Sequence, residues 1–203
     1  MKTHLLVLFA LTAVSAAAPG ASQTFDFKDP KGVNNAVFKL DAPLEAINGS
    51  ASGISGSVTF DPASPAATKG RIVISASSLH VPNPMMKEHL HGSQWMDVAR
   101  HPEITFEVSE LKNVKTDGDN TTADAVGTFA AHGVSKELTV PVKLTYLKGR
   151  LAQRVPGKQG DLLVIRANFA IKRSDFNLMP GQLEEKVSNT IELTLSVAGA
   201  SAR

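Results

Sequence analysis

Two histidines two positions apart, His89 and His91, are the residues best placed to bind a metal ion. Imidazole nitrogens are common ligands of zinc and copper. Side chains at positions i and i+2 share a face only on an extended strand, whereas on a helix they point about 200° apart. The sequence therefore leaves two interpretations open, a metal site that uses both histidines or a packed, hydrogen-bonded His89, and it favours the second.

Catalytic signatures are missing from the sequence. The chain has no cysteine, which excludes thiolate nucleophiles and disulfides. It also lacks a nucleophile elbow, an H-E-x-x-H zinc motif, a P-loop and a glycine-rich dinucleotide motif. Asp175 lies two residues after Arg173, and we interpret it as a turn carboxylate held by the neighbouring guanidinium rather than as a catalytic acid. The sequence predicts a protein that is not an enzyme and requires no cofactor.

Apolar and polar residues alternate along eight short segments, which is the pattern of half-buried strands. The segments are residues 36–40, 54–60, 72–76, 104–108, 126–130, 138–144, 163–169 and 191–197. Pro141 removes a ladder hydrogen bond, so its strand should lie at an edge or contain a bulge. Residues 83–98 lack the period of two, and Pro84 can open a helix there. The pattern predicts an all-β barrel or sandwich with one short helical insertion.

Residues 1–21 have the three parts of a secretory signal peptide. Lys2 supplies the positive charge, residues 5–11 are apolar, and residues 14–18 offer small-residue cleavage sites. The apolar part is about a dozen residues long, whereas a membrane-spanning helix needs roughly 20, so no stable membrane anchor is expected. We expect residues 1–21 to be cleaved and residues 22–203 to form one exported domain, periplasmic or secreted.

The charge of the chain gives no support for a nucleic-acid partner. The formal net charge is only +2, and the charged residues are scattered along the sequence. Nucleic-acid-binding domains instead show a basic patch or stripe. We therefore expect no nucleic acid among the partners.

Four stretches match short motifs in a fixed order. Residues 53–62 read G-x-x-G-x-(hydrophobic)-x-F-D-P, and residues 78–106 combine S-L, H-L, W-M-D and H-P before I-T-F. Residues 126–136 contain G-T-F followed by H-G-V-S-K, and residues 172–176 read K-R-S-D-F. In this order and spacing, the stretches resemble the YceI-like family, exported lipocalin-like barrels that bind polyisoprenoids or related lipids.

The resemblance implies a fold, a ligand class and a set of ligand contacts. The implied fold is an antiparallel up-and-down, lipocalin-like eight-stranded barrel, with an elongated apolar cavity that carries or sequesters an isoprenoid-like lipid or a quinone-type amphiphile. Residues 83–98 would line the entrance or plug the barrel. Family members are often dimers, so a homodimer is also expected. The side chains assigned to the ligand site are Phe38, Phe60, Leu79, Met86, His89, Leu90, Trp95, Phe106, Phe129, Phe169 and Phe176.

Two positions depart from the family pattern, and one alternative function stays open besides the less favoured metal-binding protein. Met86 and Lys87 stand where the family often has an Arg-Asp pair, which predicts a change in the head group accepted at the barrel mouth. Asn177 replaces a usual glycine, and asparagine tolerates a positive φ. The alternative is a ligand-free structural or stress-response barrel whose interior is filled by its own Phe, Leu and Ile side chains.

Overall fold

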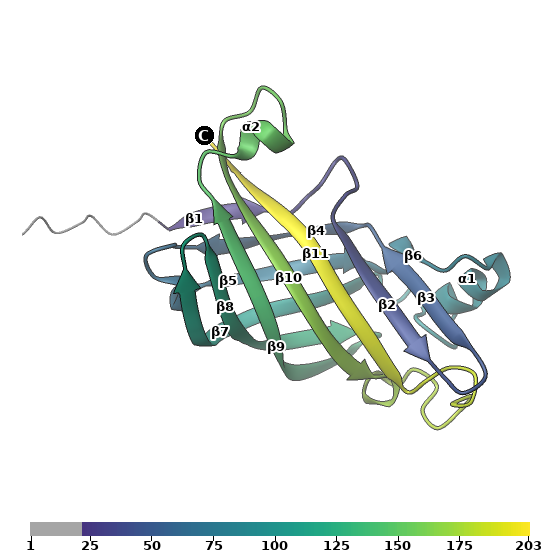
Figure 1. The fold of residues 1–203 in the computed structure, drawn as a ribbon. Helices are drawn as coiled ribbons and strands as arrows, with labels where there is room; N and C mark the ends of the chain where they lie inside the picture. The colour runs from purple at the N-terminus through teal and green to yellow at the C-terminus, as the bar shows by residue number, and fades with distance from the viewer. Residues whose placement is uncertain (1–21) are drawn as a thin grey trace, which may run out of the picture.

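A computed structural model describes residues 22–203, so the predicted signal peptide lies outside the described residues. The strands are β1 (Gln23–Asp26), β2 (Asn35–Asp41), β3 (Ala46–Ala51), β4 (Ile54–Phe60), β5 (Lys69–Ser75), β6 (Leu79–His80), β7 (Glu103–Asp117), β8 (Asn120–Ala131), β9 (Val134–Leu147), β10 (Gly160–Lys172) and β11 (Thr190–Ala202). The helices are α1 (Pro84–His91), α2 (Leu151–Arg154) and the 3-10 turns η1 (Pro65–Ala67), η2 (Ala76–Ser78) and η3 (Arg173–Phe176). Helix α1 lies at one end of the sheet, and α2 lies with the C-terminus at the other (Figure 1).

Eight strands form a closed antiparallel ring. Their order is β1-β4-β5-β7-β8-β9-β10-β11, and β1 closes the ring on β11 where Asp26 pairs with Ala200. Strands β7 to β11 follow one another as a meander. Closure gives every strand of the ring a partner on both sides for at least part of its length. The predicted eight-stranded barrel with a short helix is confirmed.

The predicted eight strands are not the same eight that close the ring. Strand β2 was expected in the ring, yet its residues 35–39 pair with residues 192–196 of β11, away from Ala200 where β1 closes the ring. Strand β3 pairs with β2, and β6 pairs with β3, so these three strands extend the sheet beyond the ring. The ring position next to β4 belongs to β1, a four-residue strand that the pattern did not predict. A strand this short has too few positions to display an alternation. The long strand β11 therefore has two partners on one side, one at each end of the barrel.

Pro141 lies where one side of β9 is unpaired. Strand β9 begins at Val134, but its ladder with β10 covers only residues 142–147. On the other side, Pro141 still faces Asp124 of β8. Strand β9 lies between β8 and β10, so it is not the edge strand that was expected; Pro141 lies one residue beyond the last pair of the β9–β10 ladder.

The buried side chains form two core clusters, one toward each end of the barrel. The first contains Phe25, Phe27, Phe60 and Leu163, and it lies toward α2. The second contains Phe38, Met96, Phe129, Ile171 and Phe176, and it lies toward α1. We call these the closed end and the mouth end.

Candidate functional site

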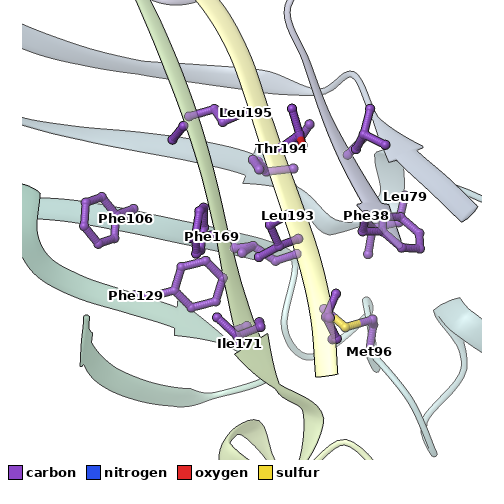
Figure 2. Close-up of a pocket in the computed structure, with 18 of the residues that line it drawn as sticks. Phe38, Leu79, Met96, Phe106, Phe129, Phe169, Ile171, Leu193, Thr194 and Leu195 are labelled. Atoms are coloured by element: carbon purple, nitrogen blue, oxygen red, sulfur yellow. The ribbon is translucent and has the colours of Figure 1, made fainter. Parts of the chain in front are cut away.

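A cavity of about 480 Å³ occupies the barrel interior. This volume lies within the range of small-molecule binding pockets. Figure 2 shows aromatic and aliphatic side chains from β2, β7, β8, β10 and β11 converging on the cavity. The labelled apolar groups are Phe38, Leu79, Met96, Phe106, Phe129, Phe169, Ile171, Leu193 and Leu195.

Several inward-facing side chains of the mouth half are only half-buried. Phe106, Phe169 and Leu193 line the cavity and alternate with outward-facing residues on their strands. Their remaining accessible surface therefore faces the interior void rather than the outside of the barrel. In this half, the interior is not filled by the protein's own side chains.

The cavity runs along the barrel axis. Its lining includes Val58, Leu111 and Leu144 of the closed-end cluster as well as Phe38 and Ile171 of the mouth-end cluster. Because one continuous void touches both clusters, it is elongated.

Packed aromatic side chains form the floor of the cavity at the closed end. Phe25, Phe27 and Phe60 are at most 2% exposed and do not line the cavity. The Tyr146 ring contacts Phe25 edge-on at a centroid distance of 6.2 Å and lies 6.0 Å from Phe60. Such contacts stabilise beyond the area that they bury. The closed end is a packed core.

A buried carboxylate, that of Asp161, fixes the closed end. Its oxygens accept hydrogen bonds from the Tyr146 hydroxyl at 2.8 Å, the Gly149 N–H at 2.8 Å and the Arg203 guanidinium at 2.9 Å. Burial alone would raise the pKa of the Asp161 carboxyl, but hydrogen bonds from Gly149, Tyr146, Gln23 and Arg203 outweigh it and hold the pKa below its ordinary value. The network ties the β9–β10 connection and the C-terminal residue to one group.

Helix α1 brings side chains to the opposite end of the cavity. The Asn83 side chain accepts a hydrogen bond from the Met86 N–H at 3.1 Å, and Pro84 occupies the first turn. This cap and the proline define where the helix starts. Met86, His89 and Leu90 then lie at the mouth and line the cavity. Residues 83–98 line the entrance, and the cavity behind them is open.

Arg173 organises the loop of residues 177–189 at the mouth. Its side chain is 1% exposed and donates to the carbonyls of Leu178, Met179, Gln182, Val187 and Ser188. A guanidinium has five N–H donors, so none is left for a ligand. Burial lowers the pKa of Arg173, while Glu184 acts in the opposite direction.

The expected Arg173–Asp175 contact is wrong. Asp175 is exposed, and all five donors of Arg173 go to backbone carbonyls. The guanidinium instead lies 5.5 Å from the centre of the Trp95 ring, a cation–π distance. Asn177 has a φ of 55°, in the left-handed region, so it keeps the turn that the family usually builds with glycine.

Nine of the eleven predicted ligand contacts line the cavity. They are Phe38, Leu79, Met86, His89, Leu90, Trp95, Phe106, Phe129 and Phe169. Phe60 is part of the closed-end core, and Phe176 supports Phe129 from behind at a centroid distance of 5.3 Å. Leu193, Leu195 and Arg173 also line the cavity but were not predicted to do so. The alternation on the last strand could have identified the two leucines, whereas no sequence pattern signals the role of Arg173. Contact of any of these side chains with a ligand stays a prediction.

The two histidines of the metal hypothesis lie on a helix. His91 contacts the carbonyl oxygen of Leu79 through its Nε2 atom at 2.7 Å, while His89 lines the cavity mouth. Helical residues two positions apart point in different directions, so the geometry that joint chelation requires is not met. Across residues 22–203, no three His, Asp or Glu side chains are grouped so that they could hold a metal ion. In the same part of the chain, no helix combines the length and apolarity needed to cross a membrane.

Solved structures share this fold. BcnA from Burkholderia cenocepacia superposes with a TM-score of 0.65 at 20% identity, covering 81% of this chain and 95% of that one. A YceI protein from Campylobacter jejuni gives 0.61 at 21% identity, with both chains covered fully. A polyisoprenoid-binding domain from Saccharophagus degradans gives 0.62 at 13% identity, covering 89% of this chain and 99% of that one. These likenesses establish the fold.

Sequence comparison establishes the family. A UPF0312 protein from Yersinia pestis is 34% identical over 155 residues, which cover 76% of this chain and 74% of the relative. A second UPF0312 protein, from Yersinia enterocolitica, is 32% identical over the same length. The model of the YceI-like domain matches residues 20–198. The barrel, its interior cavity and these matches agree, and the chain belongs to the YceI-like family.

Proposed function

We propose that this protein is an exported, non-enzymatic carrier that holds an isoprenoid-like lipid or a quinone-type amphiphile inside its barrel. The observation that carries the proposal is the continuous apolar cavity, which reaches from Met86 at the mouth to Leu144 in the closed-end cluster. Burial of apolar surface contributes about 0.8 kcal/mol per CH₂ group, so one five-carbon unit contributes about 4 kcal/mol before binding costs are subtracted. A branched hydrocarbon chain needs few polar contacts in such a site.

The ionisable groups that line the site lie at its mouth and set the orientation of the ligand. Glu45, His89 and Lys186 line the cavity there and are exposed. The inner lining is mostly aliphatic and aromatic, as at Leu144 and Ile165, and the hydroxyl of the buried Thr68 donates to the Pro65 carbonyl. Because polar groups are costly to bury unpaired, the head group stays at the mouth and the chain points toward the closed end. The packed floor then limits the length of chain that enters.

Three further parts of the proposal rest on different support. The polyisoprenoid-binding domain from Saccharophagus degradans supports the ligand class through its shared fold. The periplasmic or secreted location rests on the signal-peptide pattern of residues 1–21. The homodimer rests on the family resemblance alone.

The test is to purify the protein from its export compartment and identify what it carries. Native mass spectrometry of the full chain, followed by solvent extraction, should reveal one apolar ligand per barrel. A protein that arrives empty and takes up none of a series of isoprenols and quinones would contradict the proposal and favour the ligand-free structural barrel.

A matched pair of variants on β10 localises the ligand. Ala167 is buried and lines the cavity, whereas Ala170 is exposed on the same strand and does not. The Ala167→Phe substitution fills part of the void, so we expect at least a tenfold loss of ligand uptake. Ala170→Phe adds the same side chain outside and should retain uptake. Equal uptake by both variants would place the ligand elsewhere.

A further inference from the structure

Three large apolar side chains project into solvent around the mouth, each from a different segment. Leu44, in the turn between β2 and β3, is 64% exposed, Met85 in the first turn of α1 is 67% exposed, and Leu183 in the loop before β11 is 52% exposed. Only Val33 and Val37 are other strongly exposed large apolar residues within residues 22–203. We call Leu44, Met85 and Leu183 the rim.

The segments of the rim are tied to the barrel. The Leu44 N–H donates to the carbonyl of Glu185 at 2.9 Å, which joins the β2–β3 turn to the loop that carries Leu183. Arg173 holds that loop from inside, and the Asn83 cap fixes the turn that carries Met85. The backbone that carries the rim is therefore held in place by hydrogen bonds.

The rim is continuous with the cavity. Met85 and Leu183 are exposed to solvent and also line the void. A hydrocarbon chain that crosses the rim therefore moves from one apolar surface to another. Large apolar side chains that are exposed together at one end of a protein indicate an interaction site, and these border the opening of an apolar cavity.

The charges beside the rim indicate which lipid surface fits. Residues 42–46, 84–91 and 181–187 carry four glutamates and two lysines, a formal net charge of −2. These charged residues are Glu45, Lys87, Glu88, Glu184, Glu185 and Lys186. Proteins that bind anionic membranes by charge present clusters of Lys and Arg instead. An acidic border disfavours an anionic bilayer and is compatible with a zwitterionic one.

We propose that the rim docks the barrel, mouth first, on the surface of a zwitterionic lipid bilayer. Leu44, Met85 and Leu183 insert among the lipid head groups, as the apolar faces of interfacial proteins do. The cavity then opens onto the acyl region, and the ligand passes between bilayer and barrel without crossing water. This inference rests on the proposed function for its cargo, but the docking itself needs no cargo.

The test compares one rim residue with a matched residue at the opposite end. Leu44 does not line the cavity, so Leu44→Asp removes a rim contact without altering the void. Val33, 57% exposed, lies beside Asp29, whose carboxylate accepts from Arg154 of α2 at the closed end, and Val33→Asp is the control. Each full-length protein is sedimented with phosphatidylcholine vesicles and, separately, titrated with a water-soluble short-chain quinone.

We expect wild type and Val33→Asp to bind the vesicles alike, and Leu44→Asp to bind about tenfold more weakly, the loss expected from one buried leucine. All three should bind the soluble quinone equally. Wild-type protein that binds quinone but no vesicles would overturn the docking and leave the proposed function standing. Wild-type protein that binds vesicles but no quinone would contradict the proposed function and leave the docking standing. Tighter binding to phosphatidylglycerol vesicles, or equal weakening by both substitutions, would also overturn the docking.

Discussion

The two ends of the barrel are built from the same kinds of apolar side chain but put them to different use. At the closed end, Phe25, Phe27 and Phe60 are at most 2% exposed and pack on one another and on Tyr146. In the mouth half, Phe169 keeps surface open to the void. Similar composition therefore yields a packed floor at the closed end and an unfilled cavity that extends from that floor to the mouth. The proposed function requires this contrast, in which one half maintains the fold and the other leaves room for a ligand.

The connection that follows β1 explains part of the difference. Residues 27–34 leave β1 with Phe27 turned inward, and the Phe27 N–H bonds to the carbonyl of Gly56 at 3.0 Å. The Phe27 ring lies against Gly199 of β11, where a Cβ atom would come within 2.7 Å of it. A glycine permits this close approach. At the mouth, α1 and the loop of residues 177–189 border the cavity and leave its centre empty.

The contrast predicts unequal effects of the same truncation at the two ends. Phe60→Ala removes a fully packed ring, and we expect it to lower the free energy of unfolding by about 4 kcal/mol. Phe169→Ala removes a ring that already faces a void, so the loss should be about 1 kcal/mol. Urea unfolding of the two variants measures the difference. Equal losses would mean that the mouth half is as well packed as the closed end.

A second prediction concerns the loop that shapes the mouth. Arg173→Met leaves five backbone carbonyls without a donor, and we expect about 3 kcal/mol of destabilisation. Arg173→Lys restores up to three donors and should recover part of that loss. Arg166→Met, on the exposed face of β10, is the control and should cost less than about 1 kcal/mol. If Arg173→Met behaved like the control, the loop would not depend on the buried guanidinium.

A smaller effect, and a dependence on pH, is expected at Asp161. Its pKa is lower in the folded protein than in the unfolded chain, so its contribution is present above the unfolded pKa and is lost as pH falls through the folded pKa. Asp161→Asn should therefore cost about 2 kcal/mol near pH 7 and flatten the loss of stability on the acid side. Unfolding curves from pH 7 to pH 2 measure both. If the free energy of unfolding fell equally with decreasing pH in wild type and variant, other carboxylates would be responsible for the loss of stability in acid.

For the strands that alternation identified, the inward face could be predicted from sequence, but the position of each residue along the barrel axis could not. Alternation identified Phe60 and Phe169 alike as inward-facing groups. The first lies in the closed-end floor and the second in the cavity wall. A period of two assigns a residue to a face, whereas its position along the axis depends on the register between strands. For this reason Phe60 was placed in the ligand site although it does not line it.

The other features that the sequence did not predict depend on contacts between residues that are distant in sequence. The short strand β1 closes the ring through Asp26 and Ala200, a pairing that no local pattern records. Arg173 donates hydrogen bonds to backbone carbonyls as far along the chain as that of Ser188, because its buried N–H groups have no water to bond. The motif at residues 172–176 identified the turn that contains Arg173 but suggested Asp175 as the partner of its guanidinium. A motif shows only residues that are close in sequence, and the true partners are not.

The central claim is that the cavity takes up a chain-like apolar ligand, and Trp95 can report on it directly. The chain has one tryptophan, and its ring lines the cavity mouth. Titration of the emptied protein with an isoprenoid quinone, followed by Trp95 fluorescence, should show saturable quenching at one equivalent, and Ala167→Phe should raise the quinone concentration needed at least tenfold. Fluorescence that stays constant, or that falls linearly and equally in both proteins, would contradict the account.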